Sequence, residues 1–180
     1  MVELEMKEAL VGGRVGKIHK IQDKIIRPVN KWTEDIHHFL RFLHEEGADF
    51  VPKPHGINEN EEEVLSFVPG DVFNSLPEDL LTDTVLISAA KLLLKFHVFS
   101  EKYISRLTKN EQWMLPVITP IEVMCHGDFA PYNVTMIGIL PLVSLILIHS
   151  ILVQKCGTSS TQLIVGCPLK PLIKMLYRNK

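Results

Sequence analysis

The segment of this chain with the clearest chemical potential runs from Cys125 to Asn133, with the sequence CHGDFAPYN. Asp128 supplies a carboxylate that can accept a proton from an attacking hydroxyl, and Asn133 supplies an amide oxygen that can bind Mg²⁺. Gly127 and Pro131 favour a tight loop that brings these two side chains together across their five-residue spacing. The pattern indicates phosphoryl-transfer chemistry, and the alternative is an ordinary Asx-rich turn between strands.

The His-Gly-Asp motif with Asn five residues later, preceded by an apolar strand predicted at 121–124, resembles the catalytic loop of the aminoglycoside phosphotransferase and choline kinase-like family. The resemblance implies an α+β, protein-kinase-like two-lobed fold and transfer of the γ-phosphoryl group of ATP to a hydroxyl on a small molecule. It assigns the catalytic base to Asp128 and a Mg²⁺ ligand to Asn133. We expect His126 to fix the loop by hydrogen bonding rather than to transfer a proton.

The composition is typical of a soluble globular chain, with 46% hydrophobic and 22% charged residues among 180. No basic stripe with interleaved aromatic residues is present, so we expect no nucleic-acid partner. The acidic N-terminus lacks the apolar core of a signal peptide, and the three cysteines form no CxxC pair. These features predict a cytoplasmic protein with reduced thiols.

Glycines dominate the segment 10–18, which the pattern predicts to be two strands around a turn. Gly12, Gly13 and Gly16 suit a backbone that turns tightly or approaches a phosphate closely. A plain hairpin explains the same pattern. The resemblance favours a hairpin that covers the phosphates of ATP.

The run KIIRP at 24–28 predicts the third strand, where the resemblance implies a cation that binds the ATP phosphates. The lysine that is usual in the wider family is absent, and Arg27 is the candidate substitute because a guanidinium can bind phosphate through two donors. A solvated arginine at a strand edge is the alternative.

A helix should follow, with Thr33 as its cap, Gly47 at its end, and a buried stripe at helical spacing formed by Ile36, Phe39, Leu40 and Leu43. The resemblance implies that a glutamate of this helix holds the phosphate-binding cation. The glutamates lie only at the two ends of the predicted helix, so the sequence leaves the partner of Arg27 open.

Two strands are predicted at 50–57 and 63–68, joined by an acidic turn and ended by Pro69-Gly70. The run VLSFVPG at 64–70 resembles the corresponding stretch of bacterial phosphotransferases, which implies adenine-binding positions at Ser66 and Val68 in a hinge. A long core helix is predicted to begin at Pro77 and to run to about Glu101, with Leu80 and Leu81 on its apolar face.

The last part of the chain departs from the resemblance. All 21 acidic residues lie at or before Asp128, and 134–153 is an almost unbroken apolar run. The family should place a Mg²⁺-binding Asp soon after Asn133, in a segment such as Ile-Asp-Phe-Asp. Three explanations are open: a membrane span, which Pro141 and His149 disfavour; a buried hairpin around Gly138 and Pro141; or a shifted reading frame.

Codon degeneracy permits the third explanation. When the frame is shifted, the codons of 143–149 can encode Gly-Val-Ile-Asp-Phe-Asp-Thr, which contains the expected metal-binding segment. We therefore predict an N-lobe at 1–68, a hinge and partial C-lobe at 69–133, and an out-of-frame tail at 134–180. The C-lobe would then be incomplete and phosphotransfer impaired or lost. The alternative function is a non-catalytic interaction protein, either tail-anchored or nucleotide-binding.

Overall fold

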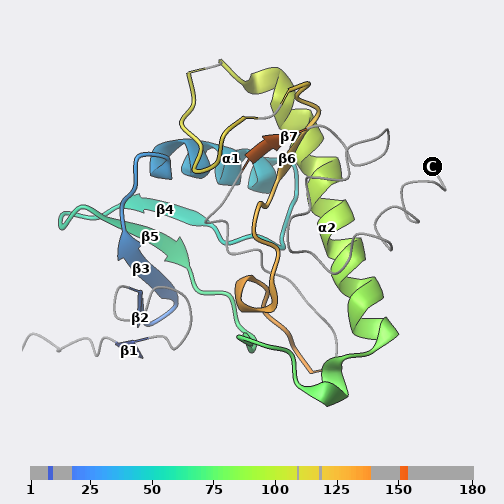
Figure 1. Ribbon diagram of the computed structural model, residues 1–180. Coiled ribbons are helices and arrows are strands. Elements are labelled where there is room, and N and C mark those ends of the chain that lie inside the picture. The colour runs from blue at the N-terminus through green and yellow to red at the C-terminus, as the bar shows by residue number, and fades with distance from the viewer. Residues whose placement is uncertain (1–7, 10–17, 109, 118, 139–150, 154–180) are drawn as a thin grey trace, which may run out of the picture.

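The computed structural model of the chain describes residues 8–9, 18–108, 110–117, 119–138 and 151–153. A five-stranded antiparallel sheet has the order β1-β2-β3-β5-β4, and a second sheet pairs β6 with β7. The helix α1 (Thr33–Glu45) lies beside the larger sheet, and α2 (Asp83–Tyr103) extends away from it next to β6 (Figure 1). The predicted combination of helices with antiparallel strands is confirmed.

The larger sheet is formed by β1 (Glu8–Ala9), β2 (His19–Ile21), β3 (Lys24–Pro28), β4 (Pro54–Ile57) and β5 (Glu62–Ser66). β3 lies between β2 and β5 and is therefore an interior strand. The strand predicted from residue 50 begins only at Pro54. Phe50 and Val51 are buried outside the ladder, and prolines at 52 and 54 cannot donate backbone hydrogen bonds to a neighbouring strand.

The predicted stripe of α1 is buried, and the helix ends as predicted. Gly47 has a φ of +89°, and the bonds from its N–H to His44 O and from Ala48 N–H to Leu43 O close the last turn. The predicted cap at Thr33 is wrong. Trp32 precedes the helix, and Thr33 Oγ1 accepts a bond from Asn30 N at 2.9 Å.

The second helix begins later than predicted. A 3₁₀ turn at Glu78–Leu80 comes first, and Thr82 then caps α2 by accepting a hydrogen bond at Oγ1 from Val85 N at 3.3 Å. Leu81, which was predicted on the apolar face, lies between the two elements and is 66% exposed. The helix continues to Tyr103, followed by a 3₁₀ turn at Ile104–Arg106.

One hydrophobic core joins α1 and β5 to α2 and β6 (Val123–Cys125). Phe39 of α1 contacts two rings of α2, with centroid distances of 5.9 Å to Phe96 and 4.8 Å to Tyr103. Met124 of β6 is fully buried in the same cluster. This core fixes the loop that follows β6 relative to the larger sheet.

The chain after β5 runs beside the chain after the candidate catalytic loop. Asp71 and Met136 exchange two backbone hydrogen bonds of 2.8 Å. Gly70 has a φ of +128°, and a Cβ atom there would lie 2.8 Å from Met136 O. The contact therefore requires glycine at this position. The predicted boundary between residues 68 and 69 stays a prediction.

Most of the predicted tail, 139–150 and 154–180, lies outside the described residues. Val134 and Met136 are buried, Ile137 is exposed, and β7 (Ile151–Val153) pairs with β6. Gly138 is described, but the rest of the hairpin proposed around it is not. Within the described ranges, no helix has both the length and the apolar character needed to cross a membrane.

Candidate active site

The candidate catalytic loop, defined as residues 125–133, begins on a strand that the core holds firmly. Val123 and Met124 of β6 are 1% and 0% exposed. Ser100 of α2 donates a hydrogen bond from Oγ to Met124 O at 3.0 Å. The long helix therefore supports the strand from which the loop emerges.

His126 is fully buried beneath the loop. Its Nδ1 atom accepts a hydrogen bond from Asp128 N at 3.3 Å, and its ring lies edge-on to Phe129 with 6.0 Å between centroids. Gly127 between them has a φ of +78°, a conformation that favours glycine. These contacts agree with a loop-fixing role for His126.

The structure brings Asp128 and Asn133 together. Asn133 donates from Nδ2 both to Asp128 O at 2.8 Å and to Asp128 Oδ2 at 3.0 Å. A 3₁₀ turn at Pro131–Asn133 produces this approach, with Asn133 N donating to Ala130 O. Asn133 is 4% exposed and Asp128 is partly exposed. The buried amide of Asn133 thus fixes the Asp128 carboxylate, which remains partly accessible to solvent.

Tyr132 is a further contact of the carboxylate that was not predicted from the sequence. Its hydroxyl donates to Asp128 Oδ1 at 2.8 Å, so each carboxylate oxygen accepts one bond from within the loop. That bond raises the pKa of Tyr132, because it stabilises the protonated phenol. The only signal in the sequence was the position of Tyr132 beside Asn133.

Arg27 is buried, so the alternative of a solvated arginine at a strand edge is wrong. It donates from Nε and Nη2 to the two carboxylate oxygens of Glu63, the residue opposite it on β5. The Nη2–Oε1 distance is 3.0 Å. His37 of α1 lies with Nε2 3.0 Å from Glu63 Oε1.

The environment of Glu63 favours its charged form. Burial alone would raise the pKa of this carboxyl group, but the hydrogen bonds from His37 and Arg27, together with the charge of Arg27, hold it below the ordinary value. The resemblance implied that the partner of Arg27 lies on the helix. In the structure the partner is Glu63 on the neighbouring strand β5, and α1 contributes His37 to the same carboxylate.

The other predicted contacts with nucleotide are only partly described. Gly12, Gly13 and Gly16 lie outside the described residues. Ser66 ends β5, and its Oγ accepts a hydrogen bond from Lys53 N at 2.8 Å. Val68 follows, partly buried, on the segment that leads to Gly70. The binding of adenine there stays a prediction.

The oxygen atoms of Asp128 and Asn133 suit Mg²⁺, which prefers hard oxygen ligands and completes its shell with phosphates and water. The amide oxygen of Asn133 is the atom that can bind a metal, and the bonds from Nδ2 to Asp128 fix the orientation of the amide. The described part of the chain contains no group of three or more His, Cys, Asp or Glu residues that could form a metal site alone.

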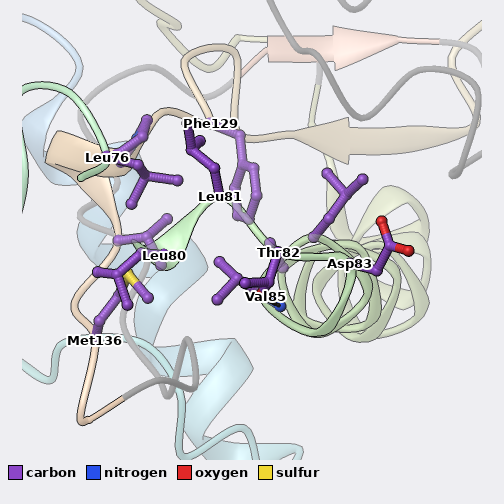
Figure 2. A pocket seen from close by; sticks show the side chains of 12 residues that line it. Leu76, Leu80, Leu81, Thr82, Asp83, Val85, Phe129 and Met136 are labelled. Atoms are coloured by element: carbon purple, nitrogen blue, oxygen red, sulfur yellow. Dashed lines mark hydrogen bonds between the residues drawn. The ribbon is translucent and has the colours of Figure 1, made fainter. Parts of the chain in front are cut away.

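An apolar pocket of about 290 Å³ lies behind the loop (Figure 2). Leucine, valine and methionine side chains converge on it, together with Phe129 from the loop. Asp128, His126 and Asn133 do not line it. The lining residues are Leu76, Leu80, Leu81, Thr82, Asp83, Val85, Leu86, Ala89, Phe129, Pro131, Val134 and Met136. The pocket is therefore not the place where the loop offers its chemistry.

Comparison with known proteins gives a structural match without a sequence match. No protein-family profile and no curated protein matches the chain. The streptomycin–ATP ternary complex of the aminoglycoside phosphotransferase APH(2'')-IIa superposes with a TM-score of 0.56 at 12% identity, covering 99% of this chain and 81% of that one. At this identity the similarity concerns the fold alone. The chain has the kinase-like α+β fold of that aminoglycoside phosphotransferase.

Proposed function

We propose that this chain is built as an ATP-dependent phosphotransferase that acts on a hydroxyl group of a small molecule. The observation that carries the proposal is the contact between Asp128 and Asn133, with the Asn133 amide 3.0 Å from the carboxylate. A base and a metal ligand held together in one loop are what transfer to a hydroxyl requires.

In this proposal Asp128 orients the acceptor hydroxyl and takes its proton as the oxygen attacks the γ-phosphorus, while the bond from that phosphorus to the β,γ-bridging oxygen breaks and ADP leaves. Asn133 holds the Asp128 backbone and carboxylate through Nδ2, and its amide oxygen would serve as a ligand for Mg²⁺. The metal, when bound, neutralises charge on the phosphates. Arg27 and the glycine segment with Gly12, Gly13 and Gly16, which the sequence predicts to be a hairpin, would contact the phosphates, and the adenine would lie against the segment 66–68.

We expect the rate of this chain to be low. No acidic residue follows Asp128, so the segment after Asn133 supplies no second carboxylate for the metal. Loss of one preorganised electrostatic group costs roughly 10²–10³ in rate. Nucleotide binding depends less on that carboxylate than turnover does, and we expect it to persist.

The test combines calorimetric titration of MgATP with a turnover assay, using streptomycin as the first acceptor probe. We expect Mg²⁺-dependent binding and little or no turnover, and any turnover that remains should disappear in Asp128→Asn. Asp79→Asn is the matched control, because Asp79 is an exposed acid outside the site. Failure to bind MgATP would contradict the proposal. Binding with no turnover, even at high enzyme concentration, would favour the alternative of a nucleotide-binding interaction protein.

We also propose that the reading frame changes between Met136 and Val143. This explains why the chain follows the kinase pattern through the catalytic loop and then contains no acid. Sequencing the gene across that interval tests it. An overlapping frame that lacks the Ile-Asp-Phe-Asp segment would overturn the idea, and membrane fractionation would separately test the tail-anchored alternative.

A further inference from the structure

A buried cluster of three polar side chains lies where three elements meet. Arg27 comes from β3, His37 from α1 and Glu63 from β5, and their exposed fractions are 8%, 2% and 1%. The carboxylate of Glu63 serves both partners, with a bidentate contact to Arg27 and a contact of 3.0 Å to His37. We call this the Arg27–Glu63–His37 cluster.

We propose that Glu63 is a positioning residue that holds the Arg27 guanidinium for the polyphosphate of the nucleotide, and that His37 fixes Glu63 from the helix. The inference rests on the proposed function, because it concerns how Arg27 reaches the phosphates. It places the anionic partner of the phosphate-binding cation on a strand of the sheet.

The register of the sheet sets up the contact. Arg27 and Glu63 are direct partners across the β3–β5 ladder, so their side chains project from the same face. Ile25 and Leu65, two residues along each strand, are also partners on that face and pack into the core under α1. The face that carries Arg27 is therefore the face that α1 covers.

The bidentate contact gives Arg27 a defined orientation. A guanidinium has five N–H donors in one plane, and two of them bind Glu63. Fixing that plane in advance reduces the side-chain entropy lost when a phosphate binds. A buried carboxylate paired in this way also keeps the cation from being left uncompensated in the absence of nucleotide.

Helix α1 contributes a histidine to the cluster, and its acids lie elsewhere. Glu34 and Glu45 are exposed at the two ends of the helix, whereas His37 is buried against Glu63. A second contact at Oε1 restricts rotation of the carboxylate about its own axis. His37 therefore acts on Arg27 only through Glu63, and its effect should be the smaller one.

The experiment compares MgATP with adenosine, which lacks the phosphates, by calorimetric titration of the full chain. We expect Glu63→Gln to weaken MgATP binding by about 10- to 100-fold, the loss for one charge-assisted hydrogen bond, and to leave adenosine binding unchanged. His37→Gln should give a smaller loss of the same kind. Glu59→Gln is the matched control, because Glu59 is an exposed acid in the turn before β5.

A second variant keeps the inference testable if Glu63→Gln does not fold. The double substitution R27M/E63L replaces a buried ion pair with apolar side chains of similar volume, a change that folded proteins often tolerate. It should remain folded and lose at least as much of the preference for MgATP over adenosine as Glu63→Gln does. Retention of the full wild-type preference for MgATP in this variant would overturn the inference.

The remaining outcomes separate the inference from the proposed function. Wild-type protein that binds MgATP no better than adenosine contradicts the proposed function and the inference that rests on it. Wild-type protein that prefers MgATP, with Glu63→Gln folded and retaining that preference, contradicts the positioning role alone. An equal loss for both ligands in Glu63→Gln would show a structural role and would also overturn the inference.

Discussion

The Arg27–Glu63–His37 cluster and the candidate catalytic loop are both polar constellations, yet they are built differently. The contacts of the cluster join residues 36 and 26 positions apart, on three elements. The contacts of Asp128 join residues four and five positions apart, within one loop. Glu63 is 1% exposed, whereas Tyr132, the outer contact of Asp128, is 37% exposed.

Because of this difference, substitutions in the two regions should change the free energy of unfolding by different amounts. The cluster exists only when the sheet and α1 are assembled, so a change there alters the free energy of unfolding as well as ligand binding. The loop closes on itself and leaves its carboxylate accessible, so a change there should affect chemistry more than stability. The predictions below test this division, beginning with the largest expected effect.

Removing the charge of Arg27 should have the largest effect on stability. We expect Arg27→Met to lower the free energy of unfolding by about 3–5 kcal/mol, because it leaves Glu63 buried without its cation. Urea denaturation measures the change. Lys95→Met is the control, since it breaks the exposed Lys95–Asp49 pair and should cost about 0–1 kcal/mol. Similar losses in both variants would show that the cluster is not structurally distinct.

Gly70 should be the next most sensitive position, because it lies where the chain after β5 meets the chain after the catalytic loop. Gly70→Ala combines a φ of +128° with a Cβ atom 2.8 Å from Met136 O. We expect a loss of about 2–4 kcal/mol from backbone strain and displaced packing, measured by thermal unfolding.

Gly47→Ala separates the effect of backbone strain from the effect of displaced packing. Gly47 has a φ of +89°, but nothing lies within 4 Å of a Cβ atom built there. Backbone strain alone should therefore cost about 1 kcal/mol at this position. Equal losses at Gly70 and Gly47 would argue against a tight contact between the two segments.

The same division explains what the sequence could predict. Asp128 and Asn133 were found because their contact depends on a spacing of five residues and on turn-forming neighbours. Glu63 was missed because its contact with Arg27 depends on the register of β3 against β5, which no local pattern specifies. The contact within one loop was predictable, whereas the contact that the sheet assembles was not.

Helix ends show a related contrast. Gly47 was predicted correctly because few residues other than glycine adopt a positive φ at a helix end. The cap predicted for the first helix and the start predicted for the second were wrong, because several residues near each start could serve as the cap. Thr33 accepts a hydrogen bond from Asn30 inside the preceding turn, while Thr82, after a 3₁₀ turn, caps α2. The out-of-frame tail stays a prediction, because 139–150 and 154–180 lie outside the described residues.

Substitution in the candidate catalytic loop should have a small effect on stability. We expect Asp128→Asn to change the free energy of unfolding by about 1 kcal/mol or less, since the new amide oxygen can still accept a hydrogen bond and the side chain is partly exposed. The same urea denaturation used for Arg27→Met measures it. A decrease in the free energy of unfolding as large as that of Arg27→Met would mean that the contacts of the Asp128 carboxylate are needed to stabilise the folded state.

The smallest expected effect is a shift in the pKa of Tyr132, which reports on the single hydrogen bond between its phenol and Asp128. Its pKa is raised by the hydrogen bond to Asp128, so the phenol should remain protonated to a higher pH than an exposed tyrosine does. Any stability from this bond is present below the ordinary pKa and is lost as the pH rises through the raised one. Ultraviolet difference titration of wild type against Tyr132→Phe isolates the signal. In Asp128→Asn the midpoint should fall, because the neutral amide no longer opposes ionisation. An unchanged midpoint would mean that the phenol does not contact the carboxylate in solution, and the described contact from the loop to the carboxylate would then be the one from Asn133.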